Sequence, residues 1–388
     1  MRIIILNCYS RNALAIINSL DKKYELIGGA EKKSDHLLGS PDKFFKSRRL
    51  KTIFRYTDPV QNINKFQEDI IIASKKYCAD AVIAAGTTIT NSLSKVKPVI
   101  MHETNAIPLV ENYDKLIKVA DKWECYQICS QLNIPAPKTV LLENSRHGLA
   151  ALNSLQFPVI VKPRDSYAAI GVARINSIKE FKLYLNTITS EANPATGGIL
   201  VQEAIDGELH DVTSCAKNGE PISMLSQQRL MTLYDFGGGG IINKTTKNSV
   251  LLDYAEKIIR HMKWNGILEF DFIKTSTGSF YLLECNPKFW GTTQLTVSAG
   301  LNMPQQLVDH LYFEKSVSPM QEYKEGLVYK WLFPECVYHW FTKPLTLSHT
   351  LRRLLNTLKK YDAKESMHNF TSHNFLHLMG IVMNKTKL

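Results

Sequence analysis

The sequence predicts a chain of mixed class, in which an α/β region is followed by an α+β region. In residues 1 to about 110, short apolar strands alternate with helical stretches, which is typical of a small, doubly wound parallel sheet. From Gly207 to about Phe313 the pattern is rich in strands, with helices near Asp253 to Met262 and Met303 to Phe313. The last stretch is basic and repeats leucines at helical spacing, so we expect a helical tail.

The N-terminal elements follow one another as apolar runs separated by polar segments. We predict, in order, a strand IIIL, a helix ALAIINSL, a strand YELIGG, a long helix from Ile63 to Cys78, and strands AVIAAG and PVIM. The segment NCYSRNA after the first strand lacks the Gly-x-Gly-x-x-Gly pattern that a dinucleotide pyrophosphate needs. A nicotinamide or flavin cofactor is therefore not expected in this sheet.

A second region begins near Asn112. Asp121 can cap a helix whose Glu124 completes a capping box, and the segment IPAP ends that helix before a strand TVLL. A strand FPVIVKP, a loop RDSYAAIG, a strand VARI, a helix from Ile178 to Ile188 and a strand GILVQEAI follow. We therefore expect domain boundaries that divide the chain into residues 1–111, 112–203, 204–315 and 316–388.

The segment GILEFDFIKTSTGSFYLLECNPKFWG predicts a hairpin with acidic side chains. A turn-forming STGS joins its two apolar strands, so Asp271 and Glu284 are expected to be cross-strand neighbours with Asn286 on the same face. Two close carboxylates repel unless a cation lies between them, and hard oxygen ligands suit magnesium. Magnesium usually completes its coordination with water and nucleotide phosphates, and Lys288 would extend its charge toward those phosphates. The alternative is a surface hairpin with solvated acids.

Composition limits the class of protein. The 388 residues are 44% hydrophobic and 21% charged, as expected for a globular chain of two or three domains. No stretch approaches the roughly 18 apolar residues that span a bilayer, and MRIIILNCYS is expected to be a buried strand rather than a signal peptide. Seven cysteines without a Cys-x-x-Cys pair are expected to be reduced core thiols, which favours a cytoplasmic protein.

The formal net charge of +11 is uneven. From Lys315 to Leu388, eleven Lys and Arg stand against five Asp and Glu, a net of +6. Such a tail favours an acidic partner, whether a membrane surface, an anionic substrate or nucleic acid. The leucines of TLSHTLRRLLNTLKKYD lie on one face of the expected helix and its basic residues on the other. This helix is expected either to lie on the inner face of an anionic membrane or to pack on the core.

Three further segments carry candidate binding groups. Lys162 ends the strand FPVIVK, and the small residues of the loop after it would let backbone N–H groups approach phosphates. VQEAIDGE offers acids for ribose hydroxyls and extended backbone for an adenine edge. The tetraglycine at 237–240 is not a P-loop, because Asn243 rather than Gly precedes Lys244 and Thr245. We expect a flexible loop there, over a substrate site or merely on the surface.

Over roughly residues 1 to 315, the sequence resembles the ATP-grasp ligases, in the branch with carbamoyl-phosphate synthetase-like and carboxylate–amine ligases. Four motifs in family order carry the resemblance: Asp121-Lys122 before a helix ending in IPAP, FPVIVKP with its loop, VQEAIDGE, and the hairpin closing in Glu-Cys-Asn-Pro. It implies a pre-ATP-grasp Rossmann-like domain (1–111), a small lobe with a phosphate-loop lid (112–203), a large lobe with the metal site (204–315) and a basic extension (316–388).

The resemblance also implies roles for single residues. ATP would be held by Lys122, Lys162, Ser166, Gly171, Gln202, Glu203, Ala204, Ile205 and Glu208, the metal by Asp271, Glu284 and Asn286, and the reacting phosphate or acyl phosphate by Arg229 and Lys288. This chain departs from the family in a phosphate loop that is poor in glycine and contains Tyr167. Glu269 is an alternative first metal ligand, since we expect Glu269 and Asp271 to alternate along the strand, so that only one can face Glu284.

The function implied by the resemblance is an ADP-forming carboxylate–amine ligase that uses ATP and Mg²⁺ or Mn²⁺. Its substrates would be a small-molecule carboxylate and an amine, in a cytoplasmic protein that can form a homo-oligomer. One alternative is a bicarbonate-using carboxylase or carbamoyl-phosphate-type enzyme. Another is a non-catalytic protein that binds a nucleotide or a nucleic acid, although the tail contains no recognisable nucleic-acid module, so nucleic acid is not the expected partner.

Overall fold

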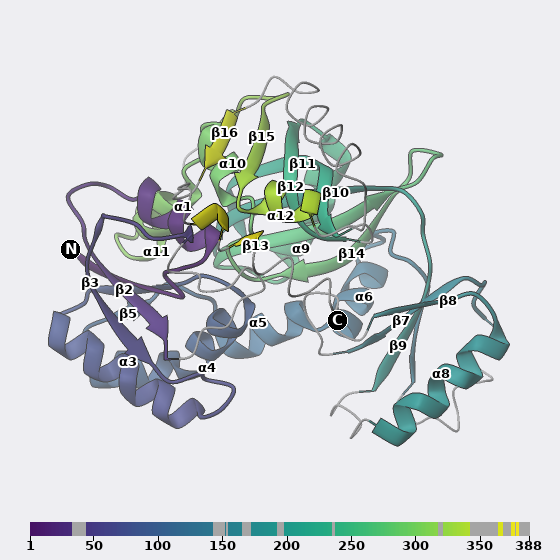
Figure 1. Ribbon diagram of the computed structural model, residues 1–388, viewed down its shortest axis with the longest axis horizontal. Coiled ribbons are helices and arrows are strands. Elements are labelled where there is room, and N and C mark those ends of the chain that lie inside the picture. The colour runs from purple at the N-terminus through teal and green to yellow at the C-terminus, as the bar shows by residue number, and fades with distance from the viewer. Residues whose placement is uncertain are drawn as a thin grey trace.

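The computed structural model arranges the chain as three sheets with helices around them (Figure 1). It is described here for residues 1–32, 44–142, 152, 154–164, 172–191, 198–234, 237–316, 321–341, 364–367, 374–376 and 378–379. The mixed α/β class and the parallel N-terminal sheet predicted from the sequence are confirmed.

The N-terminal sheet has the strand order β3-β2-β1-β4-β5, and every pairing in it is parallel. Its strands are β1 (Arg2–Leu6), β2 (Glu25–Glu31), β3 (Leu50–Tyr56), β4 (Ala81–Ala84) and β5 (Ile107–Pro108). The helices of this region are α1 (Arg11–Ser19), α3 (Ile63–Tyr77), α4 (Thr87–Glu103) and α5 (Tyr113–Ala120). Parallel strands need such crossovers. The strand order reverses between β1 and β4, where α/β sheets usually present their sites.

Two details of this sheet differ from the sequence prediction. PVIM is not a strand, because Pro98 to Met101 lie inside α4. The segment was read as a strand from its short apolar run, which alone does not separate a strand from a buried helix turn. The real fifth strand, β5, is only two residues long. β3, which the sequence prediction omitted, carries exposed Lys51 and Arg55 that interrupt its apolar run.

The small lobe is a four-stranded antiparallel sheet in the order β6-β9-β7-β8. Its elements are α6 (Lys122–Gln131), β6 (Thr139–Leu142), β7 (Val159–Pro163), β8 (Ala173–Ile175), α8 (Ile178–Glu191) and β9 (Ile199–Glu203). The predicted N-cap is confirmed: Asp121 accepts hydrogen bonds from the N–H groups of Trp123 and Glu124. The lobe projects from the rest of the molecule in Figure 1 and has a hydrophobic cluster of its own.

The large sheet has seven strands in the order β14-β13-β10-β11-β12-β15-β16. The strands are β10 (Glu208–Lys217), β11 (Glu220–Tyr234), β12 (Gly237–Thr246), β13 (Gly266–Lys274), β14 (Phe280–Asn286), β15 (Val328–Phe333) and β16 (Lys364–Met367). Its helices are α9 (Ser249–His261), α10 (Thr293–Ser298), α11 (Met303–Leu311) and α12 (Glu335–Phe341). The acidic hairpin is confirmed as β13 and β14, in antiparallel register.

The expectation of a tetraglycine loop is wrong. Gly237 to Gly240 begin β12, which pairs with β11 on one side and, further along, with β15 on the other. Glycine is required at Gly240, because a Cβ there would lie 2.1 Å from Asn243 Oδ1. The run of glycines therefore serves close packing inside a sheet rather than flexibility.

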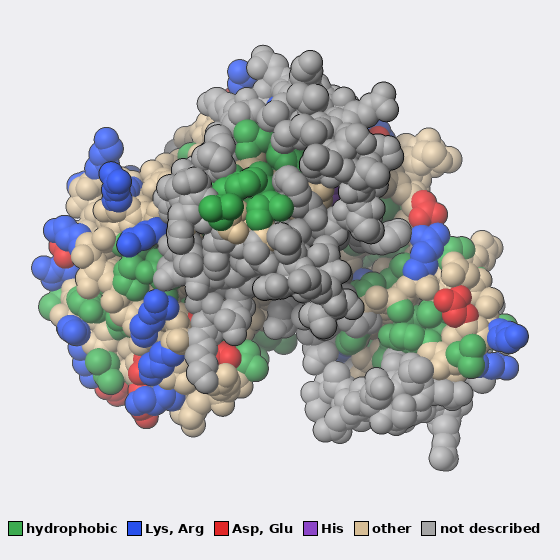
Figure 2. Space-filling view, in the orientation of Figure 1, with side chains coloured by type: hydrophobic (Ala, Val, Ile, Leu, Met, Phe, Trp, Pro, Cys, Tyr) green, Lys and Arg blue, Asp and Glu red, His purple; other side chains and the backbone are tan. Residues whose placement is uncertain are grey.

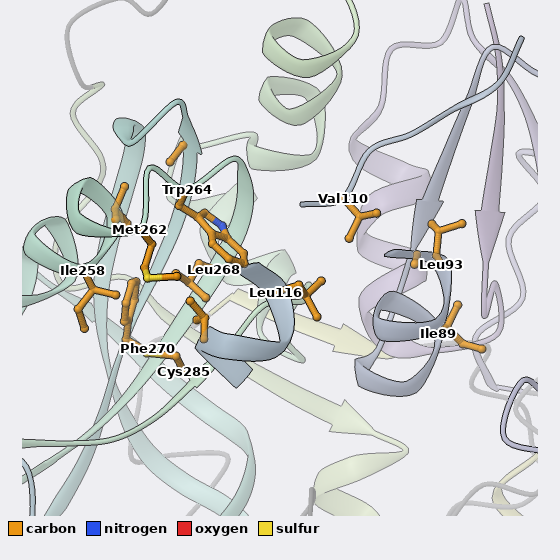
Figure 3. Close-up of a cluster of buried hydrophobic side chains, with 14 of the residues drawn as sticks. Ile89, Leu93, Val110, Leu116, Ile258, Met262, Trp264, Leu268, Phe270 and Cys285 are labelled. Carbon is orange, nitrogen blue, oxygen red and sulfur yellow. The ribbon is translucent and has the colours of Figure 1, made fainter. Parts of the chain in front are cut away.

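Hydrophobic clusters join the N-terminal sheet to the large sheet, and Figure 3 shows one of them. In Figure 3, Ile89, Leu93 and Val110 come from the N-terminal side, Trp264 and Leu268 from the large lobe, and Leu116 of α5 lies between the two groups. Leu116 is fully buried. These two parts therefore share a core, to which α6 adds Cys125, Ile128 and Cys129, whereas the strands and α8 of the small lobe form a separate cluster.

The residues of the predicted extension are not all separate from the sheet. β15 lies between β12 and β16, and all six of its residues are buried. The predicted amphipathic helix around 347–358 lies outside the described residues. Among the described residues no helix is long and apolar enough to cross a membrane. On the face drawn in Figure 2, Lys and Arg side chains are spread over the N-terminal region and the small lobe as well.

Candidate active site

Four carboxylates share one face of the large sheet. Asp271 of β13 lies opposite Glu284 on β14, as predicted, and Glu269 lies opposite Asn286. On its other side, Asp271 lies opposite Asp211 of β10. The oxygens of Asp211, Glu269 and Asp271 all approach within 4.8 Å of one another. The other face of β13 carries Phe270 and Phe272 into the core, so the pleat separates the acids from the apolar residues.

The expectation that Glu269 and Asp271 alternate is wrong. Residues two apart on a strand point to the same face, and the close approach of these two carboxylates shows it. Their partners distinguish them. The Nζ of Lys288 lies 2.9 Å from an oxygen of Glu269, whereas Asp271 lies 2.9 Å from Nη2 of Arg229 and opposite Glu284. Each carboxylate therefore has a cation of its own, and Asp271 is distinguished as a metal ligand by its place opposite Glu284.

Arg229, predicted as a catalytic residue, lies between two of the acids. Its Nη2 forms an ion pair with Asp271 at 2.9 Å and another with Asp211, and its Nε donates to Asp211 at 3.0 Å. Gln227, two residues earlier on β11, donates to Asp211 at 2.9 Å and to the hydroxyl of Thr292 at 2.8 Å. Asp211 thus holds Arg229 in place. Sequence analysis missed Asp211, although it stands three residues after Glu208 in an alternating strand.

Burial and mutual repulsion act on these carboxylates together. Burial, more than its neighbours Glu269 and Glu284, raises the pKa of Asp271 to about 7, despite the opposing effect of Arg229. Burial likewise raises the pKa of Asp211 to about 6. For Glu284, burial acts to raise the pKa, but Lys162, Lys122, the hydrogen bond from Asn286 and Lys288 together outweigh it, and the net pKa is lowered. The two predicted phosphate lysines therefore act electrostatically on the acid hairpin.

Lys162 is held by a chain of hydrogen bonds in the small lobe. Its Nζ donates to Gln202 at 3.1 Å, and the Gln202 amide donates to the hydroxyl of Thr139 at 2.8 Å. Lys162 is 8% exposed, and burial lowers its pKa. Its ammonium is therefore positioned by the side chain of Gln202, a residue for which the sequence predicted a backbone role.

The predicted adenine strand is only partly open to a ligand. Gln202 lies in β9 between Thr139 of β6 and Ile160 of β7, in the interior of the sheet. The N–H groups of Glu203 and Ala204 donate to the carbonyls of Lys138 and Pro158, at 2.9 and 3.0 Å. Among the described residues, the N–H of Ile205 is the one in this segment without a backbone acceptor. Glu208, at the start of β10, is exposed and could accept hydrogen bonds from a ribose.

Ser166 and Gly171 of the predicted phosphate loop lie outside the described residues. Arg164, directly before it, was not singled out from the sequence. Its Nε lies 2.7 Å from Asp121, the cap of α6, and its Nη2 lies 3.6 Å from Glu124. The contacts of Arg164 with Asp121 and Glu124 join the end of β7 to the start of α6, whose first residue is Lys122.

Comparison with known proteins agrees with this arrangement. Residues 119–292 match the family described as "ATP-grasp domain". The chain carries an ATP-grasp domain. The match begins beside the Asp121 cap and ends at Thr292, so it includes every site residue named above. Residues 293–388, including β15 and α12, lie beyond it.

Two curated relatives of the ATP-grasp chain are informative. It is 28% identical to a D-alanine–D-alanine ligase B of Pseudomonas putida over 203 residues, which are 48% of this chain and 62% of the relative. It is 24% identical to a carbamoyl phosphate synthase large chain of Helicobacter pylori, over 51% of this chain and 19% of the relative. The chain thus spans about three fifths of the length of the ligase it matches.

Solved structures show the same fold over more of the chain. A biotin carboxylase of Campylobacter jejuni aligns with a TM-score of 0.67 at 14% identity, covering 84% of this chain and 74% of that one. An L-amino acid ligase of Bacillus licheniformis aligns with a TM-score of 0.60 at 14% identity, covering 82% and 77%. At such identities these likenesses establish the fold alone, and the two aligned proteins are named for different reactions.

Proposed function

We propose that this ATP-grasp chain is an ATP-dependent carboxylate–amine ligase that releases ADP and phosphate. The observation that carries the proposal is the pairing of a four-carboxylate face on the large sheet with Lys162 and Lys122 of the small lobe, which lower the pKa of Glu284. Acids that face lysines across two lobes are better explained by the binding of a metal-bound polyphosphate than by a purely structural role. The 28% identity to a D-alanine–D-alanine ligase supports C–N bond formation as the chemistry.

The residues fit a divalent cation. Asp211 and Asp271 have Arg229 as their ion partner and Glu269 has Lys288, so four carboxylates stand against two directly paired cations. Of the four, Glu284 has its closest described hydrogen bond with Asn286, at 3.2 Å, and Asn286 can turn its amide oxygen inward instead. We therefore propose Asp271, Glu284 and Asn286 as the ligands of Mg²⁺ or Mn²⁺. When bound, such an ion would neutralise the charge of the ATP phosphates.

The chain's own residues would orient the substrates. Lys162 and Lys122 would hold ATP phosphates, Ile205 and Glu208 would contact adenine and ribose, and Ser166 and Gly171 would belong to the phosphate loop. A substrate carboxylate would attack the γ-phosphorus, the bond to ADP would break, and the amine would then displace phosphate from the acyl phosphate. Arg229 is held rigidly by Asp211, so it can stabilise the charge that develops without first reorganising. Lys288, whose Nζ pairs with Glu269, would do the same.

Formation of ADP tests the proposal. The protein would be incubated with Mg²⁺, ATP, a panel of small carboxylates and pools of amino acids, polyamines and amino sugars. The expected result is ADP release that requires both a carboxylate and an amine. If ATP binds but no pair supports ADP release above the rate without substrates, carboxylate–amine ligation is wrong. ADP release that needs bicarbonate instead would favour the carboxylase-type alternative.

The basic tail leads to a separate proposal about location. We propose that residues 340–388 contact an anionic membrane surface, because their basic and leucine residues segregate at helical spacing. Co-sedimentation with phosphatidylserine-containing vesicles should then fall when these residues are deleted. Equal sedimentation of the full-length and truncated chains would exclude this contact.

A further inference from the structure

The polar face of the large sheet continues past the acids toward the C-terminal strands. Arg229 of β11 lies opposite Asn243 of β12, and Asn243 lies opposite Tyr329 of β15. Trp331, two residues further on β15, belongs to the same face. Since β15 lies beyond residue 292, the face extends from the matched domain into a segment that the family match does not include.

Arg11 approaches this part of the face from the N-terminal sheet. It is the first residue of α1, which lies beside the large sheet in Figure 1. Its guanidinium stacks over the Trp331 ring at 4.7 Å from the ring centre, donates to the Gly240 carbonyl at 3.1 Å, and lies 3.4 Å from a carboxylate oxygen of Glu335. A Cβ at Gly291 would come within 2.3 Å of it. Arg11 thus reaches segments from both ends of the chain.

Polar atoms around Arg11 lack hydrogen-bond partners although they are buried. They are Arg11 Nη1, Glu335 Oε2, Trp331 Nε1 and both side-chain atoms of Asn243, which make no hydrogen bond with any residue of the described chain. Asn243 is fully buried, and Glu335 is 5% exposed. A buried polar group without a hydrogen bond destabilises the fold, so several in one place indicate a ligand that completes them.

We propose that Arg11, Asn243 and Glu335 form a subsite for the zwitterionic α-ammonium and α-carboxylate groups of an amino acid substrate. The proposal rests on the ligase function proposed above and adds to it the class of one substrate. Arg11 Nη1, Asn243 Nδ2 and Trp331 Nε1 offer donors for the carboxylate, and Glu335 Oε2 and Asn243 Oδ1 offer acceptors for the ammonium. Segment 327–341, outside the matched domain, would then complete the substrate site.

The charge of the subsite favours a zwitterion over a simple anion. Arg11 and Glu335 form an ion pair with one charge of each sign, so a ligand with a single charge would add an uncompensated charge to this buried place. A zwitterion adds one charge of each sign and keeps the subsite neutral. The position of the subsite also fits an acceptor or donor of the reaction, because Asn243 is the cross-strand neighbour of Arg229, which contacts Asp271.

Binding measurements test this subsite independently of turnover. Isothermal titration calorimetry of the full chain would use each standard amino acid, with and without Mg²⁺ and a non-hydrolysable ATP analogue. For the amino acid that binds best, its decarboxylated amine and its deaminated acid are the matched probes. We expect each probe to bind at least about tenfold more weakly, since each loses a charge-assisted hydrogen-bonded group.

Substitutions test whether the amino acid binds at this subsite. Arg11→Met and Glu335→Gln should each weaken amino acid binding about tenfold or more and change affinity for the ATP analogue by less than twofold. Arg260→Met and Glu220→Gln, which disrupt an exposed Arg–Glu pair, are the matched controls and should change neither. If Arg11→Met does not fold, Arg11→Lys and Asn243→Ala replace it.

Three results are decisive. If no amino acid binds the wild-type chain although the ATP analogue does, or if Arg11→Met and Glu335→Gln bind amino acids as tightly as the wild type, the subsite is wrong. If amino acids bind and the variants lose them, but no ADP forms with any substrate pair, the subsite stands and the proposed ligation fails.

Discussion

At the scale of single residues, Asp271 and Glu269 form a natural test pair because they share a face and differ in their partners. We predict that Asp271→Asn reduces ADP formation about 100-fold and raises the Mg²⁺ concentration needed for half-maximal rate, because it removes a proposed ligand opposite Glu284. Glu269→Gln should reduce the rate less, since Glu269 is not one of the proposed ligands and lies opposite Asn286 rather than Glu284. A magnesium titration of both variants measures this, and Asp271→Asn with an unchanged magnesium dependence would remove Asp271 from the ligand set.

Gln202 supports a second prediction at this scale. Gln202→Ala should raise the ATP concentration for half-maximal rate about tenfold and lower the free energy of unfolding by about 1–3 kcal/mol, because a buried ammonium loses its hydrogen-bond acceptor. Thr139→Val removes only the hydrogen bond between Gln202 and Thr139, and it should raise the ATP concentration for half-maximal rate less than Gln202→Ala does. Urea unfolding and ATP titrations separate the two effects. Equal ATP dependence in Gln202→Ala and the wild type would show that Lys162 does not depend on this contact.

At the scale of elements, the tetraglycine segment can be tested as a strand. Gly240→Ala should destabilise the protein by about 1–3 kcal/mol, because the new Cβ would overlap Asn243 Oδ1 at 2.1 Å within a paired strand. Gly239→Ala is the matched neighbour, whose nearest atom would lie at an ordinary 3.5 Å, and it should be nearly neutral. Thermal unfolding of both variants provides the measurement. Similar, small shifts would mean that the segment behaves as a loop.

The elements also show what sequence patterns can and cannot reveal. The acidic hairpin and the Asp121 cap were predictable because each depends on residues close in the chain, at fixed spacing. Asp211 was not, since its role arises only when β10 pairs with β13 and places it beside Asp271. The same limit applies to Arg11, whose partners lie more than 220 residues away. Local periodicity determines the face of a strand on which a side chain lies, and strand order determines which side chains of that face become neighbours.

At the scale of the whole molecule, the shared core predicts how the chain unfolds. Residues of the N-terminal sheet and of the large lobe belong to one hydrophobic cluster, with Leu116 of α5 between them (Figure 3). Because the two parts share buried clusters, we expect one calorimetric transition for both, while the strands and α8 of the small lobe, which have a cluster of their own, are free to unfold separately.

Leu116→Ala tests this coupling directly. Truncating a fully buried leucine costs about 2–5 kcal/mol, so the temperature of the shared transition should fall by several degrees while the transition remains single. Leu183→Ala in α8 is the control, because its side chain is 60% exposed and should change the unfolding free energy by less than about 0.5 kcal/mol. If Leu116→Ala instead splits the transition in two, α5 acts as a linker between independent domains. In that case the N-terminal sheet could move relative to the acids, and Arg11 would not hold a fixed place beside Arg229.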